Sequence, residues 1–502
     1  MKGKNIKSLP IILAVLVTIY YIIIFSTYTI LLHKIFYTQA FDAGIEDQAI
    51  WLFSQGMTPF ITVRGMHSFA DHIRFYQIFL APLFWFWNDI NVLFIIQALI
   101  LGSGAIFLFL FAQERIKNHF LALSITFSYL LYPALQNLNL DQFHTEALIV
   151  LPMILTLIFL LQEKYFLFYI FLMLSLIGKE DVALTTLFIG LFLILFKRNW
   201  KHGLAVMTIS LGWYLICSKI LMPYFNSLPL GSQVYSHWFR GFFANIFNPQ
   251  FYLQNFLHPE SLRYYQDLLF PLAGLPLLAP QFVFLLLPPL TINVLSGVGY
   301  LRSIYYHYNY LTIPILFIAL IEGLRYLSLT QKLGEKAKIM LALILVFSSF
   351  YFNTKLSHFP FWSHLDQLKK TFERLNTDEA ITIKNRALSL ISPAAKVSAS
   401  YSLVPHLTHR REIYMFPNPF KACLWGPWFQ EGKDLPPPLE HVDYVVIDWS
   451  NHGIEEKELV RSLSTSSQFI TIFNNNPIIV LKNKRTSFPL LPSMSFTTDL
   501  AH

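Results

Sequence analysis

Three carboxylates lie within the six residues from Asp42 to Asp47, in a chain of which only 13% of the residues are charged. The stretch follows the first long apolar run. If it is helical, Asp42 and Glu46 lie one turn apart on one face, with Asp47 beside them. Carboxylates near a membrane surface need solvent, a cation or a chemical role. One interpretation is a catalytic corner; the other is a helix start with Asp42 as N-cap.

Ionisable side chains also gather in other loops of the chain. The residues concerned are Asp71 and His72, then Asp141, His144 and Glu146, then Lys179, Glu180 and Asp181, and finally Arg302, His307 and Tyr308. Such a set suits transfer of a group from a lipid-borne donor. A carboxylate, Asp42 with Asp47 in support, would take the proton of an acceptor hydroxyl. The cationic groups Lys179, Arg302 and His307 would stabilise the phosphate that leaves.

Some of these residues are also possible metal ligands. His67, His72, Asp141 and His144 could hold a divalent ion such as Mg²⁺ or Mn²⁺, and we take His72 as the candidate ligand. The alternative is that these histidines hydrogen-bond the loops together. The two cysteines exclude a disulfide framework and a cysteine-rich metal site. No phosphate-binding glycine loop, nucleophile elbow or zinc-protease motif occurs in the sequence.

The composition indicates a helical membrane protein. Of the 502 residues, 55% are hydrophobic and 17% are aromatic, with 48 Phe. No soluble globular class has this balance. The apolar runs are continuous and do not alternate, which argues against a β-barrel. Most of the basic residues behind the net charge of +8 sit in short loops, where they set topology, so we expect no nucleic-acid partner.

Charge also predicts the orientation of the chain. Lys2, Lys4 and Lys7 precede the first apolar run, which favours a cytoplasmic N-terminus. Counting from there predicts about eleven spans in a membrane domain over 1–355, with a large first outer loop at 34–88. The spans around 267–295 are interrupted by prolines. The basic short loops then lie inside, and all the ionisable clusters lie outside the cell (inner) membrane.

One stretch predicts a hairpin. Two apolar runs of about fifteen residues flank the charged segment 179–181. Three charges in the lipid interior would cost too much for one long helix, because each costs about 2.5–3.5 kcal/mol. Two short spans with their tip on the outer side avoid this cost. The tip would be recessed in a wet cavity, or it would be a turn whose charges pair with one another.

The composition changes after about residue 355. Phe becomes scarcer, and short β-like runs at 444–448 and 469–473 alternate with helical stretches. We therefore expect a small extracytoplasmic α/β domain over 356–485, followed by a loose tail at 486–502.

Several of these motifs together resemble a known family. They are Phe41-Asp42-x-Gly44-Ile45-x-Asp47-Gln48-Ala-Ile-Trp51, Asp71-His72, Asp141-x-Phe143-His144-x-Glu146-Ala147, Lys179-Glu180-Asp181 and His307-Tyr308. The set resembles a domain-of-unknown-function (DUF) family of prokaryotic polytopic membrane proteins that is similar in layout to GT-C glycosyltransferases. The resemblance covers about 20–330, and more loosely 397–410. The chain departs from the pattern after His72, where it reads Ile-Arg-Phe, and at Glu46, where the family has an aromatic residue.

The resemblance implies a fold and a reaction. The fold would be an all-α, GT-C-like membrane domain with the small outer domain. The reaction would be hexosyl or pentosyl transfer from a polyprenyl-phosphate-linked sugar to an unknown acceptor on the outer face. In GT-C enzymes the first outer loop bears an acidic residue needed for catalysis, and Asp42 occupies the matching place. The alternatives are a lipid or solute transporter that uses the same polar cavity, and an assembly factor whose outer domain recruits partners.

Overall fold

The computed structural model describes residues 2–230, 232, 239–330, 333–427, 429–432, 442–451 and 454–486. The chain divides into two compact units. The helical unit comprises Met1–Ile30, Phe69–Phe79 and Asp89–Leu368. The sheet unit comprises Leu31–Ser68, Leu80–Asn88 and Lys369–His502. From Ser487 onward, the expected loose tail lies outside the described residues.

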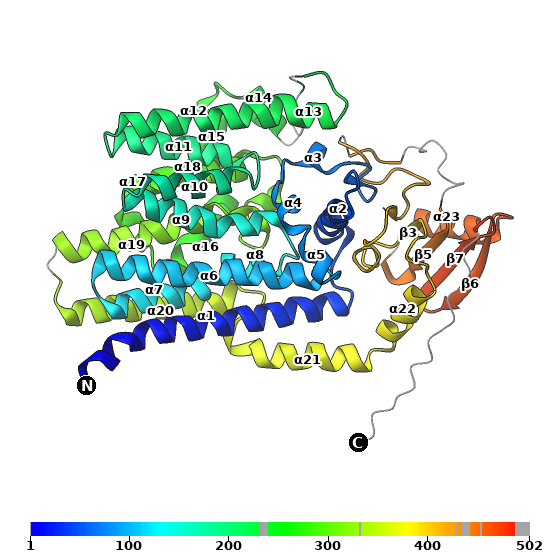
Figure 1. The fold of residues 1–502 in the computed structure, drawn as a ribbon, viewed down its shortest axis with the longest axis horizontal. Helices are drawn as coiled ribbons and strands as arrows, with labels where there is room; N and C mark the ends of the chain where they lie inside the picture. Colours follow the sequence, from blue (N-terminus) through cyan, green and yellow to red (C-terminus); the bar gives the residue numbers. More distant parts are fainter. Residues whose placement is uncertain are drawn as a thin grey trace. The chain divides into compact units, whose positions relative to one another are not determined.

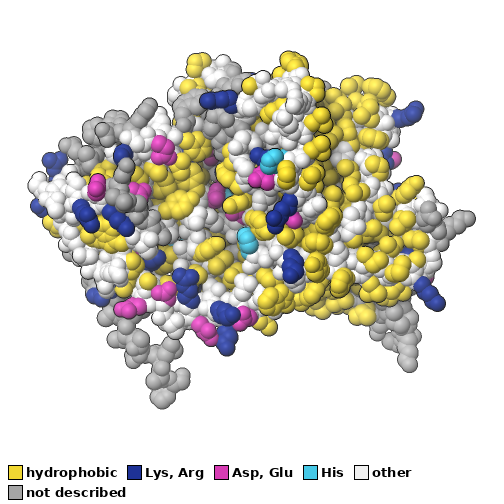
Figure 2. All heavy atoms as spheres, turned by 180° about the vertical axis from the view of Figure 1, so that it is seen from behind, with side chains coloured by type: hydrophobic (Ala, Val, Ile, Leu, Met, Phe, Trp, Pro, Cys, Tyr) yellow, Lys and Arg dark blue, Asp and Glu magenta, His cyan; other side chains and the backbone are white. Residues whose placement is uncertain are grey.

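Long apolar helices dominate the helical unit (Figure 1). In the described chain, five helical stretches are long and apolar enough to cross a membrane: Leu9–Lys34, Asn91–Ile116, Trp200–Phe225, His307–Thr330 and Glu335–Leu356. Shorter apolar helices accompany them, at Tyr76–Phe86, Thr145–Leu161, Tyr165–Leu176, Val182–Leu195 and Pro280–Leu295. Figure 2 shows hydrophobic side chains over much of the surface of these helices. The mostly helical fold with several membrane-capable helices is therefore confirmed, and the number of eleven spans stays a prediction.

Close helix packing inside this unit depends on small residues. Helix α6 (Asn91–Ile116) packs against α7 (His119–Leu130). The Tyr129 hydroxyl donates to the Leu101 carbonyl across this contact at 2.9 Å. A Cβ at Gly104 would come within 2.5 Å of that hydroxyl oxygen, so only glycine permits the approach.

The predicted hairpin is present as two short helices. Helix α10 (Tyr165–Leu176) and helix α11 (Val182–Leu195) flank a turn that carries Lys179, Glu180 and Asp181. Helix α10 packs against α9 (Val150–Leu161), and α11 packs against α12 (Trp200–Ile216). The charged turn is thus kept out of any helix interior.

Prolines break the chain over 270–295, as the sequence predicts. The segment consists of η5 (Phe270–Leu272), η6 (Leu275–Leu278), α17 (Pro280–Val283), η7 (Phe284–Leu286) and α18 (Leu287–Leu295). A proline stands at the first or second position of four of these five pieces, where its missing N–H costs nothing.

The sheet unit is built on five strands in the order β4-β3-β5-β7-β6. Strand β3 (Val397–Ala399) pairs in parallel with β4 (Ile413–Met415) and β5 (Tyr444–Asp448). Strand β7 (Ile478–Asn483) pairs antiparallel with β5 and with β6 (Phe469–Asn475). Both β-like runs predicted from the sequence are strands.

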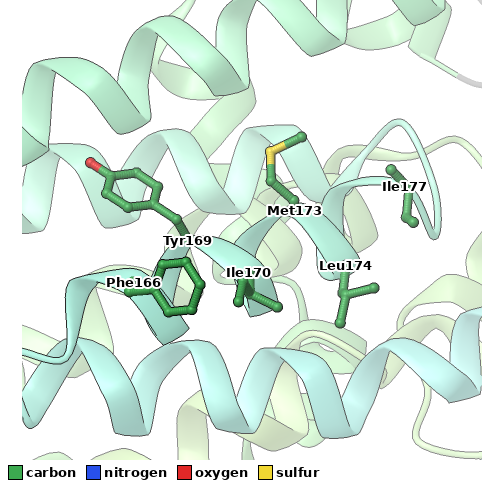
Figure 3. A pocket seen from close by; sticks show the side chains of 6 residues that line it. All are labelled: Phe166, Tyr169, Ile170, Met173, Leu174 and Ile177. Carbon is green, nitrogen blue, oxygen red and sulfur yellow. The ribbon is translucent and has the colours of Figure 1, made fainter.

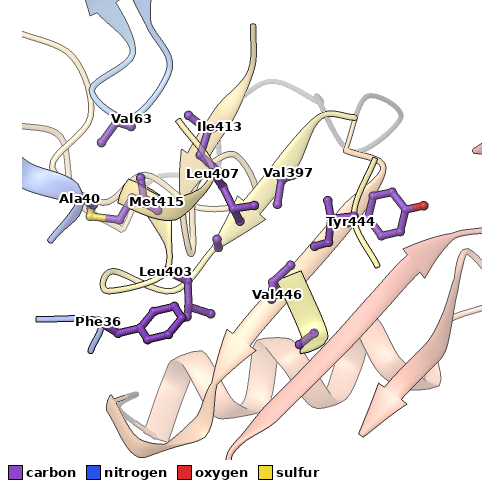
Figure 4. Close-up of a cluster of buried hydrophobic side chains, with 14 of the residues drawn as sticks. Phe36, Ala40, Val63, Val397, Leu403, Leu407, Ile413, Met415, Tyr444 and Val446 are labelled. Carbon is purple, nitrogen blue, oxygen red and sulfur yellow. The ribbon is translucent and has the colours of Figure 1, made fainter. Parts of the chain in front are cut away.

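The first loop after α1 (Lys2–Lys34) forms part of the core of the sheet unit (Figure 4). Phe36, Ala40 and Val63 are buried in one cluster with Leu403 and Met415. The sequence alone assigned 34–88 to the membrane domain. In the structure, most of this loop packs with residues more than 300 positions away, because its apolar side chains cover one face of the sheet.

Candidate active site

Asp42 lies at a kink that carries an unusual backbone conformation. Its φ of 68° and ψ of −89° interrupt the short helix η1 (Ala40–Gly44). A non-glycine residue in this conformation is strained by about 1–3 kcal/mol. Helix α2 (Ile45–Ser54) has Gly44 as its cap residue, so Asp42 is not the N-cap of α2. Asp42 is half-buried, and its strained position near the surface favours a functional role over a capping role.

Asp47, by contrast, is buried in the first turn of α2, with 1% of its surface exposed. Its two carboxylate oxygens have separate partners. The Thr408 hydroxyl donates to one of them, and the His409 ring nitrogen Nε2 lies 3.2 Å from the other. The rings of Trp51 and Phe84 contact the His409 ring. Asp47 therefore holds His409, which is only partly buried, in one orientation.

In the helical unit, Glu146 is fully buried between two cations. Arg74 Nη2 lies 3.2 Å from Glu146 Oε1, and Lys179 Nζ lies 3.0 Å from the same oxygen. Lys179 is also 4.0 Å from Asp181. Burial lowers the pKa of Lys179, but the charges of Glu146 and Asp181 outweigh burial and leave that pKa above its usual value. Lys179 is therefore a fixed cation.

The hairpin tip also holds the loop that carries His72. Glu180 Oε1 lies 2.6 Å from His72 Nδ1, and Glu180 Oε2 accepts the Ile73 backbone N–H at 3.0 Å. Burial alone would raise the pKa of Glu180, but its interactions with neighbouring groups, those with His72 above all, outweigh burial. The pKa of Glu180 is therefore lowered, to about 2. Asp181 accepts a hydrogen bond from the Tyr310 hydroxyl, and burial raises the pKa of Asp181. The loop of His72 and the segment just before α19 (Thr312–Thr330) thus meet at the tip.

Asp141 organises a second group beside this network. Its Oδ2 accepts the His307 backbone N–H at 2.8 Å and lies 3.1 Å from His307 Nδ1. The same oxygen is 3.5 Å from His144 Nε2. The two imidazoles stack with ring centres 3.8 Å apart. Burial raises the pKa of Asp141, but hydrogen bonds to His144 and His307 outweigh it and leave the pKa below its usual value.

The structure brings together most of the residues singled out from the sequence. Seven of them form the connected groups of the helical unit: Asp141, His144, Glu146, Lys179, Glu180, Asp181 and His307. The Tyr308 ring lies beside that of His307, with centres 4.1 Å apart. Arg302 lies 3.8 Å from the exposed Glu260. Asp42 and Asp47 belong to the sheet unit.

Sequence reasoning missed three participants: His409, Tyr310 and Arg74 as the partner of Glu146. His409 lies in the stretch 397–410 that resembles the family, which was the available signal. Arg74 stands two residues after His72 in a loop with few other charges. No neighbouring residue in the sequence indicates that Tyr310 takes part in the site.

A shallow apolar groove runs along α10 (Figure 3). Its volume is about 480 Å³, and its lining is Phe166, Tyr169, Ile170, Met173, Leu174 and Ile177. Its lining contains no charged residue. The groove ends at Ile177, two residues before Lys179. Its lining is almost entirely apolar.

Comparison with protein families shows which family this chain belongs to. The family described as "Predicted membrane protein (DUF2079)" matches residues 32–480. The chain belongs to this family. The DUF2079 match covers most of both units, and it confirms the family resemblance seen in the motifs.

Solved structures supply the fold relationship of this DUF2079 protein. It is similar to the crystal structure of ArnT from Cupriavidus metallidurans in the apo state, with a TM-score of 0.52 and 10% sequence identity. The similarity covers 94% of this chain and 97% of that chain. At this level of identity the similarity shows a shared fold. None of the curated proteins matches the sequence.

Proposed function

We propose that this chain is an integral membrane glycosyltransferase of the GT-C type. It transfers a hexosyl or pentosyl group from a polyprenyl-phosphate donor to an acceptor on the extracytoplasmic face. The observation that carries the proposal is the strained, half-buried Asp42 in the first outer loop, where GT-C enzymes have their essential acidic residue. The ArnT-like fold agrees with it, because the motifs resemble a family that is similar in layout to the GT-C glycosyltransferases.

In this proposal Asp42 is the general base. It takes the proton of the acceptor hydroxyl while the acceptor oxygen forms a bond to the anomeric carbon of the sugar. The bond from that carbon to the phosphate oxygen breaks, and polyprenyl phosphate leaves with the electron pair. The Tyr401 backbone carbonyl accepts from the Ala40 N–H at 2.9 Å and helps to fix the kink that presents Asp42.

Asp47 has a supporting role. It is too deeply buried to meet an acceptor, but it orients His409, which is partly exposed. A buried carboxylate that holds a histidine is the arrangement that fixes the tautomer of a catalytic imidazole. His409 would assist the proton transfer or bind the sugar.

The donor would meet the helical unit. Its prenyl chain would lie in the apolar groove of α10, and its phosphate would lie near the tip beyond Ile177. Lys179 supplies a cation there that Glu146 already orients, and Arg302 supplies another on the loop before His307. Glu146, Glu180 and Asp181 would hold these groups in position.

A transporter of a lipid or solute is the second candidate. The buried ion pairs between Glu146, Arg74 and Lys179 favour it, because buried charges in membrane proteins also mark transport pathways. The two functions differ in their product. A transferase releases polyprenyl phosphate, whereas a transporter moves an unchanged substrate.

The test is Asp42→Asn, assayed for release of polyprenyl phosphate from labelled polyprenyl-phosphate sugars in membranes that contain the native acceptor. We expect the rate to fall by about 10²–10⁴-fold, the usual contribution of a general base. The matched control is Asp89→Asn, because Asp89 Oδ1 accepts from the Asn91 N–H and the asparagine oxygen can accept the same hydrogen bond. Melting temperatures of both variants report folding. Full activity of Asp42→Asn would remove Asp42 as base, and substrate movement without phosphate release would favour the transporter.

A further inference from the structure

Asp141, His144 and His307 come together from two distant loops. One carboxylate oxygen and one nitrogen from each imidazole all lie within 4.8 Å of one another. The individual distances are shorter, at 3.1 Å from Asp141 Oδ2 to His307 Nδ1 and 3.5 Å to His144 Nε2. His72, the ligand expected from the sequence, is held by Glu180 and is not a member of this group among the described residues.

These distances match the spacing of ligands around one metal ion. With bonds of about 2.0–2.2 Å to nitrogen and oxygen, neighbouring ligands of a tetrahedral ion stand about 3.4 Å apart. Both separations from Asp141 Oδ2 are close to that value. An ion would replace the hydrogen bond between Asp141 and the His307 ring, and the two stacked imidazoles would have to rotate so that both nitrogens point at the ion.

Hydrogen bonds from neighbouring residues hold the loops that carry the three side chains. Gln97 on α6 accepts the His144 backbone N–H at 2.9 Å. The Gln97 amide donates to the backbone carbonyls of Asn139 and Gln142 at 3.1 and 2.7 Å, on either side of Asp141. Asp141 in turn holds the His307 backbone. Such outer contacts orient ligands in metal sites.

The charge of the surroundings also favours a cation. The contacts at the tip and around Asp141 join five carboxylates with two permanent cations and the imidazole of His72: Asp71, Asp141, Glu146, Glu180 and Asp181 with Arg74, Lys179 and His72. A divalent ion would offset part of this excess negative charge. The two imidazoles, stacked at 3.8 Å, cannot both be protonated at low cost, and a metal needs them neutral.

We propose that Asp141, His144 and His307 bind one divalent transition-metal ion. Two imidazoles and a carboxylate suit Zn²⁺ first, then Mn²⁺ or Fe²⁺, and are a poor set for Mg²⁺, which prefers oxygen ligands. The remaining coordination position would take water or a phosphate oxygen. Metal binding itself holds whether or not the chain transfers a sugar.

The test measures bound metal directly. The full-length chain, purified in detergent without a polyhistidine tag, is stripped with a chelator and then titrated separately with Zn²⁺, Mn²⁺ and Mg²⁺. Elemental analysis after desalting gives the stoichiometry, and calorimetry gives the affinity. We expect one Zn²⁺ per chain and weaker retention of Mg²⁺. We also expect Co²⁺ to give visible absorption bands of a nitrogen- and oxygen-ligated site.

Variants locate the ion. His144→Gln and His307→Asn keep the size and polarity of the sites, and each should weaken binding by at least about 100-fold, since even outer-shell changes cost 10–100-fold. The matched control His72→Gln should retain wild-type binding. Two outcomes would overturn the assignment: a wild-type chain that retains no metal, or wild-type binding that survives in both ligand variants. A melting temperature for each chain, measured without metal, separates lost binding from lost folding.

Discussion

At the scale of single residues, the two aspartates of the loop after α1 have different environments although the sequence places them five positions apart. Asp42 is half-buried on strained backbone, whereas Asp47 is buried against Thr408 and His409. Strain is retained where surrounding structure over-determines it, which is common at functional sites. This difference separates the residue that could meet an acceptor from the residue that positions a neighbour.

Glu146 provides a prediction at this scale. It is fully buried and is the shared partner of Arg74 and Lys179. Glu146→Gln removes the nearest counter-charge of two buried cations, so we expect the free energy of unfolding to fall by about 3–5 kcal/mol. Thermal unfolding in detergent would measure this. The control Glu163→Gln removes an exposed carboxylate and should change little. Equal melting temperatures of the two variants would contradict the ion-pair account.

A histidine in the sheet unit gives a prediction about pH. His406 is buried, and its ring stacks on that of His33 with centres 4.1 Å apart. Burial, and then the neighbouring His33 and Lys384, hold the pKa of His406 well below 6.5. The unfolded chain therefore binds a proton below pH 6.5 that the folded chain does not bind. Stability should be fully present above pH 6.5 and should fall as the pH is lowered, by up to about 1.4 kcal/mol per unit.

The measurement is the melting temperature of the wild type and of His406→Gln between pH 7.5 and 5.5. The variant should lose most of the slope, because glutamine does not titrate. An unchanged slope in the variant would assign the pH dependence to other groups.

At the scale of elements, the parts that the sequence predicts well are those set by local rules. The hairpin of α10 and α11 follows from span length and the cost of burying Lys179, Glu180 and Asp181. The strands β5 and β6 follow from their β-branched and aromatic residues. The breaks at 270–295 follow from proline.

The parts that the sequence does not predict depend on long-range pairing. The partner of Asp47 is 362 positions away, and that of Asp141 is 166 positions away. The kink at Asp42 cannot be distinguished from a helix cap without the structure, because both readings place an acid before a helical run. The structure brings many of the candidate residues together, but their pairings depend on the fold and could not be predicted from the sequence.

At the scale of the whole molecule, four segments of the helical unit contact one another around the hairpin tip. His72 contacts Glu180, Arg74 contacts Glu146, and Tyr310 contacts Asp181. Four separate segments of the chain therefore converge, which is what an active site assembled from outer loops requires. The basic loops near Lys117 and Lys336 do not take part in these contacts.

We propose that the loops around the Lys179–Asp181 tip face the extracytoplasmic side of the membrane. Labelling of single cysteines tests this orientation. In a chain carrying Cys217→Ser and Cys423→Ser, single cysteines would replace the exposed residues Gln55, Gln250, Glu163 and Lys336 in turn. In intact cells, a membrane-impermeant maleimide should label Gln55→Cys and Gln250→Cys. It should label Glu163→Cys and Lys336→Cys only after permeabilisation. Labelling of Glu163→Cys and Lys336→Cys in intact cells, with protection of Gln55→Cys and Gln250→Cys, would contradict the account.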